Sequence, residues 1–407
     1  MNMQIYQRQY YLDWLRIAAI MGVLFFHSAM PFAAEEGWHI KNNETSYLFT
    51  EFNFMLSRFR MPLLFFISGT VSYFMLQKYG SGKEFIKQRF LRLFIPLLFG
   101  MLVIVPPQIY LERVNQGFQG SYWDFYPTVF RGKPYPEGNT SWHHLWFILY
   151  LFIYDILSVP LFMWLLKEKS KSFKERLGWF ANGKRIYLFT IPTIIVFASL
   201  ALKFPVKNNL VDDWMAFFYW WSFMLAGYLM ITNLKLMDSL ERNRRTSLLL
   251  AFILYILVNY LRWNKHEPWS ANNSNWKSLP STYAYLSVYP AIAWMMIMAL
   301  VGYAKHYINK KRSVLNYCNE ALYPFYILHQ TIIVILAFYV VQLKESILAK
   351  YFFIVILTFI ISLLIHHLII RPNKYFRVLF GMRIKKQIKK EELIIPVKEE
   401  IMMAEAV

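Results

Sequence analysis

The chain has 407 residues, of which 57% are hydrophobic, 19% are aromatic and only 17% are charged. Soluble domains usually carry about 25% charged residues, so the composition excludes an ordinary water-soluble fold. The net charge of +20 would suit a nucleic-acid partner, but its distribution along the chain argues against that class. The single cysteine, Cys318, excludes an internal disulfide and argues against a thiolate metal cluster.

Apolar runs recur along the whole chain, and each is long enough, at about 20 residues, to cross a bilayer core as a helix. In lipid a segment must satisfy its own backbone polar groups, so each run is predicted to be helical. The first run is too long for a cleaved signal peptide and lacks its basic start and cleavage site. We predict an all-α integral membrane protein with ten spans, near residues 12–33, 52–77, 91–110, 143–166, 186–203, 213–232, 246–262, 282–304, 319–342 and 350–370.

The segments between these spans alternate in charge. Thirty Lys and Arg residues fall in the two termini and every second connection, against nine in the other connections. The basic side of a membrane protein faces the cytoplasm, so both termini are predicted to be cytoplasmic. Most of the positive charge is then a topology signal, part of which can also contact anionic lipid head groups. We therefore expect membrane lipids, and no nucleic acid, as partners.

The first predicted span carries three ionisable residues, Asp13, Arg16 and His27. Arg16 and His27 are separated by about three helical turns plus roughly 20°, so they share a helix face about 16 Å apart along the axis. Asp13 can meet Arg16 on that face. One interpretation is that Asp13 and Arg16 reach the interface and His27 only packs. We favour a functional polar stripe, because ionisable residues inside a membrane are costly and usually functional.

The next two predicted spans contribute arginines. In "FRMPLLFFISG", Arg60 lies near the predicted depth of His27, where a buried guanidinium needs an anion or a carbonyl partner. In "KQRFLRLFIP", Arg89 and Arg92 share one helix face at the predicted cytoplasmic start of the third span. A guanidinium group can bind phosphate through two hydrogen bonds, so this pair suggests a nucleotide-bearing cofactor. Ordinary positive-inside charge is the alternative interpretation.

The predicted outer segments are rich in aromatic, amide and histidine side chains. Trp and Tyr are expected at membrane interfaces, but aromatics mixed with His and Asn also suit stacking on sugar rings. "SWHHLWF" opens the fourth span from the outer side, with its two histidines expected near the surface. Our candidates for acceptor binding are Trp142, His143, His144 and Trp146. In the ninth span, "LYPFYILHQ" places Tyr326 and His329 in the predicted first turns.

Together these motifs resemble the membrane acyltransferase family 3, which includes O-antigen and peptidoglycan O-acetylases and glucan succinyltransferases. The resemblance covers roughly residues 10–372, so we expect a transmembrane domain over 1–372 and a basic, partly disordered cytoplasmic tail over 373–407. The features that carry it are, in chain order, Asp13, Arg16, His27, the "RMPLLFFISG" run, Arg89, Arg92, Pro96, Tyr326 and His329.

The resemblance implies a cytoplasmic acyl-CoA donor, acetyl-CoA or succinyl-CoA, and a hydroxyl acceptor on an extracytoplasmic glycan or glycolipid. It makes His27 the general base, Arg16 the residue that stabilises the acyl tail or the oxyanion, and Asp13 the residue that orients Arg16. A transient acyl-His intermediate is an open alternative. No metal is expected. The residues grouped with the cofactor are Arg89, Arg92, Arg60, Tyr326 and His329.

The main alternative function is a transporter in which the stripe of Asp13, Arg16 and His27 is a proton or anion path. Many transporters contain inverted repeats, and the sequence shows none. We therefore expect an enzyme of the inner cell membrane. The acyl group, the acceptor and the oligomeric state, a homodimer included, stay open.

Overall fold

The computed structural model describes residues 8–34, 37–270 and 274–383. Over these residues the chain is helical, with two isolated β-bridges and no strand. Nine of the described helices are long and apolar enough to cross a membrane. A pair bent by 119°, Glu168–Ala181 with Arg185–Leu200, makes a tenth if it is one span. Only its second member lies where the fifth span, 186–203, was predicted. The all-α prediction with about ten spans is confirmed, whereas the side of the membrane on which the termini lie stays a prediction.

The third span, Gly82–Asn115, is not one regular α-helix. Two π-helical turns interrupt it, and such turns are frequent at functional sites. Its successive elements are α3 (Gly82–Arg89), η1 (Phe90–Phe94), α4 (Ile95–Phe99), η2 (Gly100–Ile104) and α5 (Pro106–Asn115).

The other long helices are α1 (Tyr10–Ala29), α2 (Tyr47–Tyr79), α7 (Trp146–Leu166), α9 (Thr190–Leu200), α10 (Trp214–Thr232), α11 (Leu234–Trp263), α12 (Pro280–Tyr307), α13 (Val314–Val340) and α14 (Ile347–Ile365). The short helices are α6 (Tyr122–Phe125), η3 (Tyr126–Arg131), η4 (His143–Leu145), η5 (Glu168–Ser170), α8 (Lys171–Leu177), η6 (Gly178–Ala181), η7 (Arg185–Phe189), η8 (Trp276–Ser278), η9 (His366–Ile370) and α15 (Lys374–Leu379).

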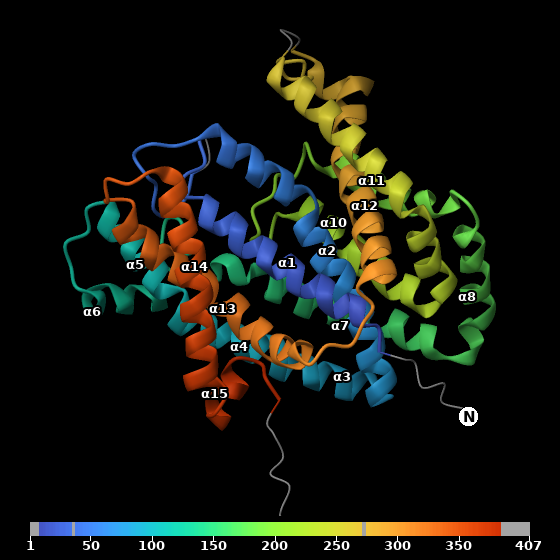
Figure 1. The fold of residues 1–407 in the computed structure, drawn as a ribbon, viewed down its shortest axis with the longest axis horizontal. Helices are drawn as coiled ribbons and strands as arrows, with labels where there is room; N and C mark the ends of the chain where they lie inside the picture. Colours follow the sequence, from blue (N-terminus) through green and yellow to red (C-terminus); the bar gives the residue numbers. More distant parts are fainter. Residues whose placement is uncertain (1–7, 35–36, 271–273, 384–407) are drawn as a thin grey trace, which may run out of the picture.

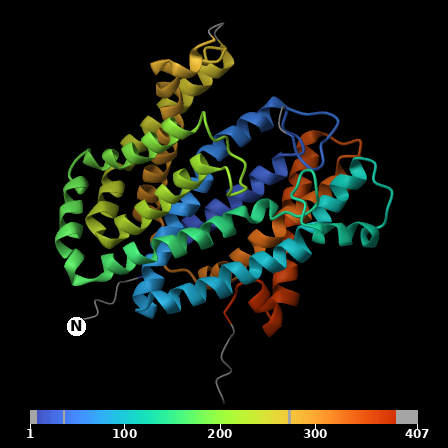
Figure 2. The same ribbon diagram turned by 180° about the vertical axis from the view of Figure 1, so that it is seen from behind.

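Helix α2 lies at the centre of the bundle beside α1, with α13 and α14 on one side and α10 to α12 on the other (Figures 1 and 2). The third span runs across below them from α3 to α5 in Figure 1. Helices α11 and α12 pack along each other and project beyond the rest of the bundle. Small residues allow α2 and α10 to approach closely. A Cβ at Gly69 would lie 2.0 Å from the carbonyl oxygen of Met224, and one at Gly227 would lie 1.9 Å from that of Phe66. Such small-residue contacts are typical of helix packing in membranes.

Helix α13 begins at Val314, five residues before the predicted start of the ninth span. The expectation that Tyr326 and His329 lie in its first turns is therefore wrong, because both are buried near the middle of the helix. Helix boundaries are the least certain part of a prediction from an apolar pattern, and this start was placed five residues too late.

The beginning of the predicted cytoplasmic tail packs against the bundle. Arg377 on α15 is buried and forms an ion pair with Glu320 at 2.7 Å. Gly381 has a φ of +66°, and a Cβ there would lie 2.7 Å from the carbonyl oxygen of Arg92. The tail therefore reaches the third span. The boundary at residue 372 stays a prediction, and residues 384–407 lie outside the described part of the chain.

Candidate active site

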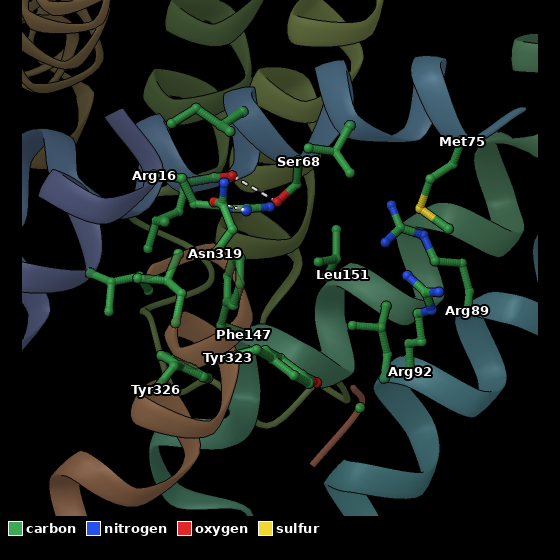
Figure 3. Close-up of a pocket in the computed structure, with 17 residues that line it drawn as sticks. Arg16, Ser68, Met75, Arg89, Arg92, Phe147, Leu151, Asn319, Tyr323 and Tyr326 are labelled. Carbon is green, nitrogen blue, oxygen red and sulfur yellow. Dashed lines mark hydrogen bonds between the residues drawn. The ribbon is translucent and has the colours of Figure 1, made fainter. Parts of the chain in front are cut away.

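A cavity of about 210 Å³ lies between α1, α2, the third span, α7 and α13 (Figure 3). Figure 3 shows Arg89 and Arg92 on one side of this inner cavity and Arg16 beside Asn319 on the other. The walls between them are mostly apolar and aromatic, and include Ile20, Leu64, Val71, Leu93, Phe147, Leu151, Leu322, Tyr323 and Tyr326. Cationic ends joined by an apolar wall suit a ligand in which an anionic group carries a less polar chain.

Asn319 holds Arg16 more closely than Asp13 does. The Arg16 Nη2 donates to the Asn319 Oδ1 at 2.5 Å, whereas the Asp13 carboxylate lies 3.7 Å away. Asp13 also accepts a hydrogen bond from Arg8 at 2.9 Å. The Arg16 side chain keeps 31% of its surface exposed, and its Nε has no protein partner. Arg16 can therefore still bind a ligand, and Asn319 is an orienting residue that the sequence did not reveal.

Arg89 forms an ion pair inside the bundle with Asp155 of α7, at 2.8 Å between Nε and Oδ2. Ser72 of α2 bridges the two, since it accepts from Arg89 Nη2 at 2.7 Å and donates to Asp155 Oδ1 at 2.8 Å. Asp155 is fully buried and Arg89 is nearly so. Asp155 was not among the residues predicted from the sequence, although a lone carboxylate in the apolar run "LFIYDILSVP" is a signal that could have found it.

Asp155→Leu is expected to destabilise the folded protein strongly, because it leaves Arg89 buried without its carboxylate. Removing one partner of a buried ion pair usually costs about 3–5 kcal/mol, whereas apolar replacement of both is often nearly neutral. Arg89→Met combined with Asp155→Leu should therefore recover most of the loss. Thermal unfolding of the purified variants in detergent measures both effects, and a single variant as stable as the wild type would contradict the ion-pair role.

A second cavity adjoins the first and extends its cationic surface. Arg16, Ile67, Val71 and Met75 line both cavities. The second cavity adds three cations, Arg8, Lys78 and Arg383. Two of these come from the beginning and end of the described chain, so only the tertiary structure could place them beside α2.

A third cavity, of about 770 Å³, lies at the other end of α1 and is called the outer cavity here. All four predicted acceptor residues, Trp142, His143, His144 and Trp146, line it together with His27. The structure corrects the expectation that both neighbouring histidines lie near the surface. His144 is 5% exposed, and its Nε2 bonds to the carbonyl oxygen of Ile327 at 3.0 Å. Further lining residues are Trp38, His39, Tyr135, Thr140, Ser141, Asn208, Asn209 and Gln330.

His27 is half-buried in the bundle and faces this outer cavity. Its ring centroid lies 5.2 Å from that of His329, and the His329 ring lies 5.1 Å from that of His144. Arg60, whose Cζ lies 3.3 Å from the centroid of the Phe26 ring, interacts electrostatically with His27. Of the predicted cofactor residues, Arg89, Arg92 and Tyr326 line the inner cavity, whereas Arg60 and His329 lie beside His27.

A second polar cluster in the outer cavity joins His39 to Glu112 of α5. His39 Nδ1 is hydrogen-bonded to Glu112 Oε2, and the Tyr135 hydroxyl donates to Glu112 Oε1 at 2.9 Å. Burial and the neighbouring carboxylate raise the pKa of Tyr135, so its hydroxyl keeps its proton at neutral pH. Neither His39 nor Glu112 was predicted from the sequence, because neither stands in a motif and their contact joins positions 73 residues apart.

His39, Glu112 and His143 together could also hold a metal ion, since one ligand atom from each lies within 4.8 Å of the others. His143 has a φ of +41°, a conformation that is strained for a residue with a side chain, and its Nε2 has no protein partner. His39 and Glu112, however, already bond directly to each other. The expectation of no metal stays a prediction.

One helical turn separates the inner cavity from the outer one. Tyr326 lines the inner cavity and Gln330, four residues later on α13, lines the outer cavity. Four residues of α-helix rise about 6 Å. On α7, Phe147 lines the inner cavity and the adjacent Trp146 lines the outer cavity. A ligand extending past Tyr326 would thus come within reach of His27.

The chain matches the family model described as an acyltransferase domain (acyltransferase 3) over residues 9–367. It is also similar to glucans biosynthesis protein C of Salmonella schwarzengrund and of Salmonella typhimurium. Each is 28% identical over 276 residues, which cover 64% of this chain and 68% of the relative. No solved structure matches the chain.

Proposed function

This chain belongs to the membrane acyltransferase 3 family, and on that premise we propose that it transfers an acetyl or succinyl group from cytoplasmic acyl-CoA to a hydroxyl of an extracytoplasmic glycan or glycolipid. Family membership makes it a transferase, which removes the main reason to consider a transporter. The proposed location is the inner cell membrane, with the inner cavity on the cytoplasmic side.

The observation that carries this proposal is the single turn of α13 between the two cavities. A donor that stays on one side and an acceptor that stays on the other must meet without either crossing the membrane. The apolar wall of the inner cavity leads from the arginines to Tyr326. A thioester on a long arm can therefore approach His27 while its phosphates remain at the cationic end.

The cations of the two adjoining cavities would bind the CoA phosphates. Arg92 lines the inner cavity and is only half-buried, which makes it the better phosphate ligand of the predicted pair. Arg89 adds positive charge while Asp155 and Ser72 hold it in place. Guanidinium and ammonium groups form charge-assisted hydrogen bonds with phosphate. Arg8, Lys78 and Arg383 extend the proposed binding surface.

The aromatic and amide side chains of the outer cavity would hold the acceptor. Trp38, Trp142 and Trp146 offer ring faces for stacking on sugars, and Asn209 and Thr140 offer hydrogen-bonding groups. The Trp142 indole is itself fixed by donating to the Asn208 carbonyl oxygen at 2.8 Å. The name of the relatives, glucans biosynthesis protein C, supports a glucan as the acceptor.

In the proposed reaction the acceptor oxygen attacks the thioester carbon as His27 removes the hydroxyl proton. The carbon–sulfur bond then breaks, and His27 returns the proton to the thiolate, which leaves as free CoA. Arg60 is the cation beside His27 and would offset the negative charge that develops on the carbonyl oxygen. Arg16 lies about 16 Å from His27 along α1, too far to contact the same carbonyl, so we assign it to binding the donor.

Transfer in sealed vesicles tests the proposal. Labelled acetyl-CoA or succinyl-CoA is added outside inside-out vesicles loaded with a glucan oligosaccharide, and the sugar is analysed by mass spectrometry. The expected result is ester-linked label on the enclosed sugar, and none when right-side-out vesicles receive the same donor. Uptake of labelled donor without ester formation, or hydrolysis alone, would contradict a transferase with this orientation.

A further inference from the structure

A chain of hydrogen bonds runs beside the outer cavity from the Ile104 carbonyl group to the Glu112 carboxylate, and Gln330 is its middle member. Both ends are groups that only accept hydrogen bonds. The donor and acceptor atoms between them can therefore be assigned step by step from either end. The two assignments meet at the Gln330 amide.

From the first end, the Thr331 hydroxyl donates to the Ile104 carbonyl oxygen at 2.7 Å. Since its proton is used there, Thr331 Oγ1 must accept from Gln108 Nε2, also at 2.7 Å. The Gln108 carbonyl oxygen then faces Gln330 and accepts from its Nε2 at 3.1 Å. This end fixes the nitrogen of the Gln330 amide on the side of Gln108.

From the other end, the Glu112 carboxylate accepts the proton on His39 Nδ1. A neutral imidazole with that proton has its lone pair on Nε2, which lies 3.5 Å from Gln330 Nε2. The nitrogen of Gln330 is again the atom required. Turning the amide over would set two acceptors against each other both at Gln108 and at His39. The orientation of the Gln330 side chain thus follows from the Ile104 end, and a neutral His39 agrees with it.

Once its nitrogen is committed, Gln330 has only its carbonyl oxygen left for His27, which lines the same cavity. That oxygen is buried and forms no well-aligned hydrogen bond, and His27 Nδ1 is likewise buried without one. A carbonyl oxygen can only accept, so it binds an N–H of His27, and it stabilises the imidazolium more than the neutral ring. Hydrogen bonds from a charged donor are stronger than those from a neutral one.

The charged and titratable groups that face His27 are Arg60 of α2, His329 of α13 and His144 of η4. None of them is an anion, and Arg60 opposes a positive charge on the imidazole. A neutral acceptor such as Gln330 can partly offset the repulsion between Arg60 and the His27 imidazolium. Unlike a carboxylate, it does not form an ion pair that would keep His27 protonated.

We propose that Gln330 is a positioning residue for proton transfer at His27, and that Glu112 and His39 hold its carbonyl oxygen in place to stabilise the imidazolium. This inference rests on the proposed role of His27 as the base. Its atoms are present before any ligand binds, so the stabilisation requires no rearrangement during the reaction.

The test is the pH dependence of the transfer rate of nanodisc-embedded Gln330→Met and Gln330→Glu variants. The rate rises with pH as His27 loses its proton, and stabilising the imidazolium moves this rise to higher pH. Gln330→Met removes the acceptor, so the rise should move to lower pH by about one unit. Gln330→Glu supplies a charged acceptor and should move it to higher pH. Glu112→Gln should act in the same direction as Gln330→Met, with a smaller shift.

A ¹⁵N-histidine NMR titration of the same variants in nanodiscs should show the same order at His27, independently of turnover. The matched control is Gln342→Met near the end of α13, because the exposed Gln342 side chain donates only to the Phe338 carbonyl oxygen. That variant should leave both profiles unmoved. If His27→Gln abolishes transfer but the Gln330 variants are only slower, with the rise of the rate at the wild-type pH, the inference about Gln330 is overturned and the proposed function stands. If His27→Gln remains active, the proposed function and this inference both fail.

Discussion

His27→Ala is expected to leave the protein folded and able to bind acyl-CoA, while acyl transfer falls by roughly 10²–10⁴-fold, the usual contribution of a positioned acid–base group. His27 lines the outer cavity one helical turn beyond the inner one. His27→Gln keeps a hydrogen-bonding side chain but cannot take the proton, so it should be nearly as inactive. Transfer by purified variants in nanodiscs measures the loss, and acyl-CoA binding is measured in parallel.

His266→Gln is the matched control, because His266 is an exposed histidine beyond the end of α11. It should transfer at the wild-type rate. If His27→Gln also retains that rate, His27 is a packing or hydrogen-bonding residue. The base would then have to be His329, whose ring lies next to that of His27, or His144, whose ring lies next to that of His329.

Removing the arginines of the inner cavity should have the second large effect. Arg92→Ala combined with Arg89→Met and Asp155→Leu is expected to weaken acyl-CoA binding by about 3 kcal/mol, because charge-assisted hydrogen bonds to phosphate are lost. This corresponds to a roughly 100-fold increase in Kd. Replacing Asp155 together with Arg89 separates the loss of a phosphate ligand from the instability of an unpaired buried carboxylate. Equilibrium binding of labelled CoA to the purified variant measures the change.

The control for general electrostatics is Arg185→Ala. Arg185 is exposed on η7, where its guanidinium lies over the Trp179 ring, 4.4 Å from the centroid. Its removal should leave CoA binding unchanged. Unchanged binding in the triple variant, with a normal melting profile, would leave Arg92 as a topology signal and Arg89 as the structural partner of Asp155.

The amino-acid sequence was sufficient to identify a helical membrane protein with about ten spans. Run length and composition decide that question, because hydrocarbon admits only segments that satisfy their own backbone. The fifth span is the informative exception. Its apolar run is real, yet it forms the short α9 after a sharp bend, because composition does not record where a helix turns. The spacing of Arg16 and His27 also followed from sequence, since it depends on a single helix.

Which side chains meet depends on how the helices pack against one another. Asp155 joins Arg89, Asn319 joins Arg16, and Gln330 joins His39 across 291 residues of chain. Each contact depends on how two helices are rotated and how closely they approach. Close approach depends on details such as Gly69 and Gly227, whose missing side chains let α2 and α10 touch. Hydrophobic periodicity specifies which face of a helix is buried but not which neighbour covers that face. The polar partners of the site therefore became visible only once the helices were packed.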